Sequence, residues 1–240
     1  MVHDWERTAA EMARMSRALL ELAQPGAVEN AIVDWAVRSV PGCEAAGLVT
    51  ATRGARVSCL AASGPLPRGC DDLQHELREG PCHDALWEGT TFIAVDLIAD
   101  TRWPAWSPAA VRLGVRSVMG FPLSTEGGVL GALNFYATRP HAFDQLAQRI
   151  AAICAAHAAV GFRWAQTAHN LRQAIASREE IGQAVGILVE RMRITPEQAF
   201  QELNRVSSHT NLKVRDLART IVLTGQLPTV PGEAGEPAPA

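Results

Sequence analysis

Lysine is almost absent from this sequence of 240 residues. Lys213 is the only lysine, and every other basic residue apart from histidine is an arginine. The sequence therefore has no GxxxxGK[ST] phosphate-binding loop, because that loop needs a lysine next to the bound phosphates. It also lacks the strand-end lysine that a phosphoacceptor receiver domain places beside its acidic cluster. Neither class of protein is expected here.

The cysteines do not form the pairs that zinc sites or redox sites need. Cys43, Cys59, Cys70, Cys82 and Cys154 are odd in number and widely spaced, and no CxxC pair occurs. This pattern argues against a disulfide framework and against a structural zinc site. We therefore expect no metal centre.

Long apolar runs and a targeting signal are also missing. No run of eighteen apolar residues occurs, so a transmembrane helix is not expected. The first residues do not combine a basic stretch with an apolar one, and we expect a cytoplasmic protein without a membrane partner. The net charge of −3 excludes a uniformly basic nucleic-acid coat but leaves room for a local basic surface.

Helical and period-two patterns of apolar residues alternate up to residue 137, which predicts an α+β domain. The expected helices cover residues 4–22, 31–40 and 71–78, and a further helix begins at Pro81. The expected strands cover residues 45–52, 57–63, 91–95, 115–123 and 129–137, with the first two joined as a hairpin. Residues 64–69 and 96–108 are expected to be loops.

A long helix is predicted from Pro140 to about Arg193. Two heptad series fit it: Ile150, His157, Trp164, Leu171, Arg178 and Val185, and Leu146, Ile153, Val160, Thr167, Ala174, Ile181 and Leu188. This is the pattern of a coiled-coil seam, although His157, Thr167 and Arg178 interrupt it. The alternative is one long helix that packs on its own sheet. We favour a dimer seam, because a periodic helix beyond ~25 residues without caps is typical of coiled coils.

Two shorter helices are expected to follow. Thr195, Pro196 and Gln198 have the spacing of a capping box with proline at the first helical position. The apolar face of this helix is expected to contain Ala199, Phe200, Leu203 and Val206. A turn over 207–211 and a third helix are expected next, with Leu212, Leu217, Ala218, Ile221 and Val222 buried and Gly225 at its end. Residues 228–240 are expected to be a disordered tail.

The C-terminal helices form the only net-basic part of the chain. Residues 168–227 have a balance of +2, whereas residues 1–167 have −3. Arg205, Lys213, Arg215 and Arg219 lie close in sequence to hydroxyl and amide side chains, a mixture that suits phosphates and base edges. The alternative is a solvated helix face with ordinary cap residues.

The same segment resembles an ANTAR domain. The resemblance is carried by residues 177–191 (SREEIGQAVGILVER), 199–203 (AFQEL), 207–208 (SS) and 211–218 (NLKVRDLA). It implies a three-helix RNA-binding module that acts, usually as a dimer, on paired stem-loops in nascent transcripts and prevents termination. By this resemblance the RNA contacts are Arg205, Ser207, Asn211, Lys213 and Arg215. Structural roles are implied for Gln183, Gly186, Ala199 and Phe200, with Gly186 expected at a close helix crossing.

Roughly residues 10–160 are similar to GAF sensor domains. The similarity is carried by residues 79–85 (EGPCHDA), 95–97 (VDL), 102–104 (RWP), 121–123 (FPL) and 131–136 (GALNFY). It implies a central antiparallel sheet with helices on one side and a small-molecule pocket on the other. No signature for cyclic nucleotide, bilin or haem is present, so the ligand and any cofactor stay unknown.

These resemblances predict a dimeric regulator rather than an enzyme. Its expected parts are a sensory domain (1–150), a coiled-coil linker helix (151–176), an RNA-binding domain (177–227) and the tail (228–240). One alternative is a DNA-binding transcription factor, because a small basic three-helix module can resemble a helix-turn-helix. The other is a methionine sulfoxide reductase of the GAF type, which would use cysteines such as Cys59, Cys70 and Cys82.

Cys82 and Trp103 are the candidate sensor or ligand residues. Cys82 is expected in the first turn of the helix that Pro81 begins, where the helix N-terminus would favour the thiolate and lower its pKa. The alternative is that Cys82 is a small buried filler, as most free cysteines are.

Overall fold

The structure is a computed structural model that describes residue 10 and residues 12–15, 17–18, 22, 26–52 and 56–228. The chain divides into two compact units, Met1–His169 and Asn170–Ala240, here called the N-terminal and C-terminal units. The expected turn at 53–55 and most of the expected tail, residues 229–240, lie outside the described residues, as does part of the helix expected over 4–22.

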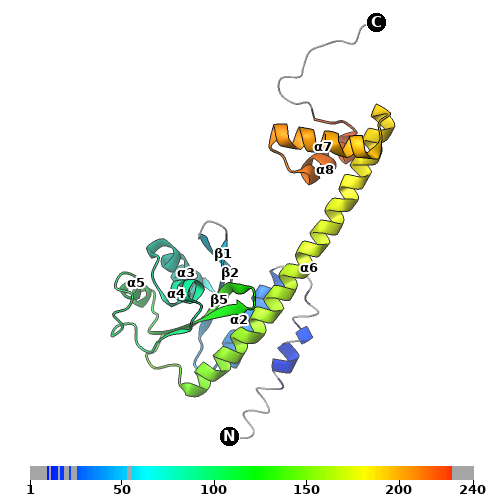
Figure 1. The fold of residues 1–240 in the computed structure, drawn as a ribbon. Helices are drawn as coiled ribbons and strands as arrows, with labels where there is room; N and C mark the ends of the chain where they lie inside the picture. Colours follow the sequence, from blue (N-terminus) through cyan, green and yellow to red (C-terminus); the bar gives the residue numbers. More distant parts are fainter. Residues whose placement is uncertain are drawn as a thin grey trace. The chain divides into compact units, whose positions relative to one another are not determined.

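The fold combines one sheet with helices of very different length (Figure 1). The helices are α2 (Ala27–Ser39), α3 (Pro65–Leu77), α4 (Pro81–Glu88), α5 (Trp106–Arg112), α6 (Gln145–Met192), α7 (Pro196–Thr210) and α8 (Val214–Thr224). The strands are β1 (Ala45–Thr52), β2 (Arg56–Ala62), β3 (Phe92–Ala94), β4 (Ser117–Thr125) and β5 (Gly128–Ala137). No described helix is both long and apolar enough to cross a membrane.

The five strands form an antiparallel sheet with the order β2-β1-β5-β4-β3. All five predicted strands are therefore present, and the α+β class is confirmed. In the N-terminal unit, α2 and the first part of α6 cover one face of this sheet, and α3, α4 and α5 lie on the other (Figure 1). The unit thus has three layers, with apolar clusters on both faces of the sheet.

Small side chains bring α6 close to the first face of the sheet. Ala147, Ala151, Ala155 and Ala158 are buried there, together with Phe162. These alanines recur at helical spacing, so one stripe of α6 presents almost flat backbone to the sheet. The N-terminal part of α6 therefore packs on its own domain.

Two expected loops are partly helical. The loop expected over 64–69 is wrong, because α3 begins at Pro65. Pro65 and Pro67 both lie in the first turn of α3, where a helix has no intrahelical use for the N–H that proline lacks. The loop expected over 96–108 is also too long, since α5 begins at Trp106.

The C-terminal unit packs α7 and α8 on the last turns of α6. The predicted capping box of α7 is confirmed: the Gln198 N–H donates to Thr195 Oγ1 at 3.3 Å, and the Thr195 N–H donates to Gln198 Oε1 at 2.9 Å. Gly225 ends α8 in the left-handed conformation, as expected. Ala199, Leu203, Val206, Leu217, Ala218 and Ile221 are buried and Val222 is partly buried.

Three expectations for this unit are wrong. Phe200 is 44% exposed and Leu212 is 49% exposed, so neither belongs to the core. The turn expected over 207–211 is mostly helix, because α7 continues to Thr210 and only Asn211 turns left-handed. The Ser208 and Thr210 hydroxyls donate to carbonyls four residues earlier, and this pairing keeps both residues compatible with helix.

The residues of the predicted seam on α6 lie in three different environments: against the sheet, in the core of the C-terminal unit, and exposed to solvent. Ile150 is buried against the sheet, while Ile181, Val185 and Leu188 pack into the core of the C-terminal unit. Three large seam residues are exposed, Val160 at 67%, Trp164 at 51% and Leu171 at 61%, and so is Ile175 at 60%, which lies beside them but outside the two predicted series. We call these four residues the exposed stripe. A heptad seam along the whole helix is therefore wrong, and the exposed stripe has no packing partner among the residues that the structure describes.

Candidate sensory site and nucleic-acid interface

A row of three residues crosses the sheet where α3 and α4 approach it most closely. Asn134 on β5 lies opposite Gly47 on β1 and Gly120 on β4. A Cβ atom at Gly47 would lie 2.6 Å from Asp71 Oδ2, and one at Gly120 would lie 2.7 Å from the Pro81 carbonyl oxygen. Glycine at both positions therefore lets α3 and α4 rest directly on the sheet, on either side of Asn134.

Asp71 on α3 is the centre of a buried polar cluster above this row. Its Oδ1 accepts hydrogen bonds from the Asn134 amide at 2.9 Å and from the Tyr136 hydroxyl at 2.7 Å. Gln74 donates to the same hydroxyl at 3.3 Å. All four residues are buried, and Asp71 Oδ2 and Asn134 Oδ1 have no hydrogen-bond partner among the described residues. Burial raises the pKa of Asp71 to about 7, so its carboxyl changes charge near neutral pH.

Gln74 also connects α3 to the start of α4. Its Oε1 accepts from the Cys82 N–H at 2.7 Å and from the His83 N–H at 3.4 Å. Gly80, which precedes Pro81, has no side chain to cap these N–H groups. The amide of Gln74 therefore acts as the cap that α4 lacks locally.

Cys82 lies in the first turn of α4, as the sequence predicts. Its side chain is 1% exposed, and burial raises the pKa of its thiol well above the ordinary value. The expectation that the helix N-terminus lowers this pKa is therefore wrong, because desolvation of the thiolate outweighs the helix dipole. The thiols of Cys43, Cys59 and Cys70 have pKa values raised to about 12 by the same cause.

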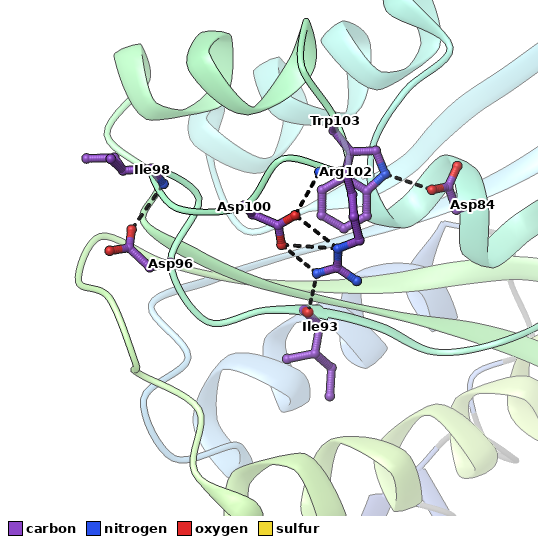
Figure 2. A network of polar contacts seen from close by, with 7 residues as sticks. All are labelled: Asp84, Ile93, Asp96, Ile98, Asp100, Arg102 and Trp103. Carbon is purple, nitrogen blue, oxygen red and sulfur yellow. Dashed lines mark hydrogen bonds and ion pairs between the residues drawn. The ribbon is translucent and has the colours of Figure 1, made fainter.

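Trp103 ends a loop that is tied down at several points (Figure 2). Its indole N–H donates to Asp84 Oδ2 on α4 at 2.7 Å, and its side chain is 2% exposed. The guanidinium of Arg102 lies 4.4 Å from the centre of the indole ring, pairs with Asp100 and donates to the Ile93 carbonyl at 2.6 Å. The loop is thereby bonded to both α4 and β3.

The two sensor candidates are both connected to α4. Cys82 lies in the first turn of this helix, and Asp84, two residues later, accepts the hydrogen bond from the Trp103 indole. The side chains of Cys82 and Trp103 are both buried, so neither is open to a ligand in this conformation. Among the described residues, no group of His, Cys, Asp and Glu side chains is arranged to hold a metal ion.

Four of the five expected RNA contacts lie around the end of α7 and the start of α8. Asn211 is the left-handed C-cap of α7, and Lys213 precedes the first residue of α8. The Ser207 hydroxyl donates to the Leu212 carbonyl at 2.5 Å, which fixes the path between the helices. Arg215 lies in the first turn of α8, 3.6 Å from Asp216.

Arg205 lies apart from the other four. Its guanidinium pairs with Glu202 at 2.7 Å, one turn earlier on α7. It lines a groove with Met192, Ile194 and Gln198, where α6 passes into α7. The structure therefore groups Ser207, Asn211, Lys213 and Arg215 and leaves Arg205 on a different part of the unit.

Of the four residues expected to have structural roles, only Ala199 is buried. Gln183 and Gly186 are exposed, as is Phe200. No described atom outside the local backbone of α6 lies within 4 Å of the position that a Cβ would take at Gly186, so the close helix crossing expected there is wrong.

The sequence did not reveal the polar cluster around Asp71. Asp71, Gln74 and Asn134 were not singled out, although Asn134 stands between two large apolar residues in a strand that is otherwise buried. An amide in such a run is the available signal, because a buried polar group needs a partner. The partner itself, Asp71, could not be found from spacing, since 63 residues separate the two.

Comparison with protein families assigns both units. The model of the GAF domain matches residues 24–163, and the model of the ANTAR domain matches residues 169–222. A search of curated proteins finds no match.

Solved structures share the fold of the N-terminal unit at low identity. A domain of a putative two-component sensor histidine kinase protein from Sinorhizobium meliloti 1021 is 21% identical, with 61% of this chain and 95% of that chain covered and a TM-score of 0.51. The GAF domain of an Acinetobacter phosphoenolpyruvate-protein phosphotransferase is 12% identical, with 68% and 98% covered and a TM-score of 0.54. Free methionine-R-sulfoxide reductase from Neisseria meningitidis is 18% identical, with 68% and 93% covered and a TM-score of 0.52.

Asp71 makes stability depend on pH. Its folded pKa of about 7 exceeds the ordinary value of 3.8, so the unfolded chain releases this proton first as pH rises. The free energy of unfolding therefore decreases between about pH 4 and pH 7, by about 1–4 kcal/mol from this group. We expect Asp71→Asn to lose this decrease and to be more stable than the wild type at pH 8. Urea unfolding of both proteins at pH 5 and pH 8 measures the free energy of unfolding. If this free energy differs between the two pH values by the same amount in Asp71→Asn as in the wild type, the assignment is wrong.

Burial also decides how the cysteines react. We expect Cys82, Cys70 and Cys154 to be labelled by a thiol reagent only when the chain unfolds, because their side chains are buried. Cys43 and Cys59 are partly exposed and should be labelled first. Peptide mass spectrometry after labelling with and without urea measures the order, and early labelling of Cys82 in the folded protein would show that α4 opens readily.

Proposed function

Since the chain belongs to the GAF domain family and also carries an ANTAR domain, we propose that it is a sensory regulator that binds stem-loop RNA in nascent transcripts and causes antitermination. The succession of the two domains carries the proposal. Both are regulatory domains, and a regulator acting on transcripts would work in the cytoplasm. The sensory domain is proposed to cover 1–150, the linker helix 151–176 and the RNA-binding domain 177–227.

Exposed basic side chains on the C-terminal unit support RNA as the partner. Lys213 and Arg215 lie at the start of α8, next to the left-handed Asn211. Lys213 is exposed and has no ion-pair partner within the described part of the chain. The two cations are the proposed phosphate contacts, and the Asn211 amide is the proposed contact to an unpaired base. Ser207 and Arg205 are assigned supporting contacts.

The loop over 95–105 is the proposed point at which a signal enters. A small molecule that binds between this loop and α4 would displace Trp103 from Asp84 and expose the region around Cys82. Its effect on RNA affinity is limited to its differential binding to the two states of the loop.

Enzymatic use of the cysteines is disfavoured by their surroundings. The pKa of the Cys59, Cys70 and Cys82 thiols is raised by burial, whereas a nucleophilic cysteine needs an accessible thiolate. The reductase fold neighbour therefore indicates a common architecture, not a common reaction. Turnover of free methionine sulfoxide by the purified protein would overturn this reading.

The phosphate contacts can be tested by a double substitution. We expect Lys213→Ala with Arg215→Ala to lower affinity for stem-loop RNA about tenfold or more, and to make the dependence of log K on log salt shallower by about 1.4. A double variant of Arg149→Ala and Arg163→Ala, on the N-terminal unit, loses the same charge and should bind as the wild type. Gel shifts at several salt concentrations measure both. Equal binding by the Lys213 and Arg215 variant, or stronger binding to duplex DNA by the wild type, contradicts the proposal.

The exposed stripe is the proposed dimer contact. Its residues lie four, seven and four positions apart on α6, which puts them on one side of the helix. We expect Trp164→Glu to give a monomer, because two copies of the stripe would then bring like charges together. Gln173→Glu adds the same charge on the opposite side of α6 and should leave the dimer intact. Sedimentation measures the mass of each.

The same substitution tests the use of paired targets. A monomer should bind a single stem-loop almost as the wild type does, but lose the advantage that two linked modules have for two adjacent stem-loops. If Trp164→Glu remains dimeric and still prefers paired stem-loops, the dimer contact lies elsewhere.

A further inference from the structure

A groove on the C-terminal unit lies between α6 and α8. Its space is about 690 Å³, and it is lined by Gln183, Gly186, Ile187, Glu190 and Arg191 from α6 and by Val222 and Gly225 from the end of α8. This volume lies in the range of small-molecule sites. None of these residues is among the RNA contacts assigned above.

Packing among the described residues does not explain the glycine at position 186. A glycine inside a helix is destabilising by about 1 kcal/mol relative to alanine. Such a glycine is usually explained by a neighbour that leaves no room for a side chain, but outside its own helix backbone no described atom lies within 4 Å of a Cβ built at Gly186. The described residues therefore leave open space at this position.

The walls of the groove are apolar and its rim is polar. Ile187 and Val222 are partly buried and offer flat apolar contact next to Gly186. Gln183 and Glu190 are exposed at the rim, three residues before and four residues after Gly186 on the same helix. The rim therefore supplies hydrogen-bond donors and acceptors around Gly186, which contributes no side chain to the floor of the groove.

Arg191 lies at the end of the groove, close to the C-terminus of α8. Its Nη2 lies 3.0 Å from the position of a Cβ at Gly225, whose φ of +69° closes α8. A guanidinium at the C-terminus of a helix is stabilised by the helix dipole. Arg191 thus presents a planar cation at the groove, suited to stacking or to pairing with a base edge.

We propose that this groove binds an unpaired purine from the loop of the RNA target. A glutamine side chain can form bidentate hydrogen bonds with the edge of adenine, and an arginine side chain can do so with the edge of guanine. Unpaired loop bases are the usual targets of sequence-specific RNA-binding proteins. The excess of basic residues over 168–227 suits a polyanion. The inference rests on the proposed function, in which Lys213 and Arg215 hold phosphates; the groove adds the reading of sequence.

A pair of glycines allows a matched test. Gly182 precedes Gly186 by one turn, is equally exposed and equally free of neighbours, but does not line the groove. We expect Gly186→Leu to fold normally, since leucine is a better helix former than glycine, and to fill the floor of the groove. Gly182→Leu is the control. Thermal unfolding of both variants checks that neither is destabilised.

The probe is a pool of RNA stem-loops with randomised loops, selected on the wild-type full chain. Each base of the selected loop is then replaced by an abasic residue, and binding is measured for the wild type and both variants. We expect one purine whose removal weakens wild-type binding about tenfold. Gly186→Leu should bind the intact loop about tenfold more weakly and be insensitive to removal of that base. Gln183→Ala should accept other bases at the same position, and Gly182→Leu should behave as the wild type.

Three results would overturn the inference in distinguishable ways. If no stem-loop is selected, the proposed function fails along with the groove. If stem-loops are selected but Gly186→Leu remains as sensitive to each abasic position as the wild type, RNA binding stands and the groove is not the reader. If both leucine variants lose dimer mass in sedimentation together with affinity, a helix of a second copy occupies this face.

Discussion

The hydrogen bonds that Asp71 accepts from Asn134 and Tyr136 join the two halves of the sensory domain. Asp71 belongs to α3 and its donors to β5, so these bonds hold the helical layer on the sheet. A carboxyl group buried among apolar side chains is tolerated only when it is hydrogen-bonded. Glycine at position 47 leaves room for this carboxyl, and a larger residue there would separate α3 from the strand that it covers.

The position of α4 follows from that of α3. Gln74 lies on α3 near Asp71, donates to Tyr136 and accepts from the first N–H groups of α4. Asp84 on α4 then holds the indole of Trp103, which closes the loop over this face (Figure 2). The hydrogen bonds of Asp71 position α3, those of Gln74 position α4 on α3, and that of Asp84 positions the Trp103 loop on α4.

The sequence was informative wherever a local rule decides the structure. Alternating apolar residues located the strands, and Thr195 and Gln198 marked the start of α7, because neither depends on distant residues. Burial at helix ends was less predictable: Phe200 and Leu212 are apolar yet exposed, since only the packing of three helices decides which positions face inward. The polar cluster was out of reach for a related reason. Asn134 is visible in the sequence as an anomaly, but its partner is determined by the sheet register and by how α3 lies on it.

Helix α6 shows why periodicity alone does not identify a partner. One apolar repeat runs along 48 residues, yet its first part packs on the sheet and its last part on α7 and α8. The middle part is also apolar, but its side chains are exposed and have no packing partner among the described residues. Gly186, on a different side of the helix from Leu188, is the reverse case: it is a glycine at a position where the described residues leave room for a side chain. Neither the exposed stripe nor the open space at Gly186 is explained by packing among the described residues. Both are therefore candidate binding surfaces.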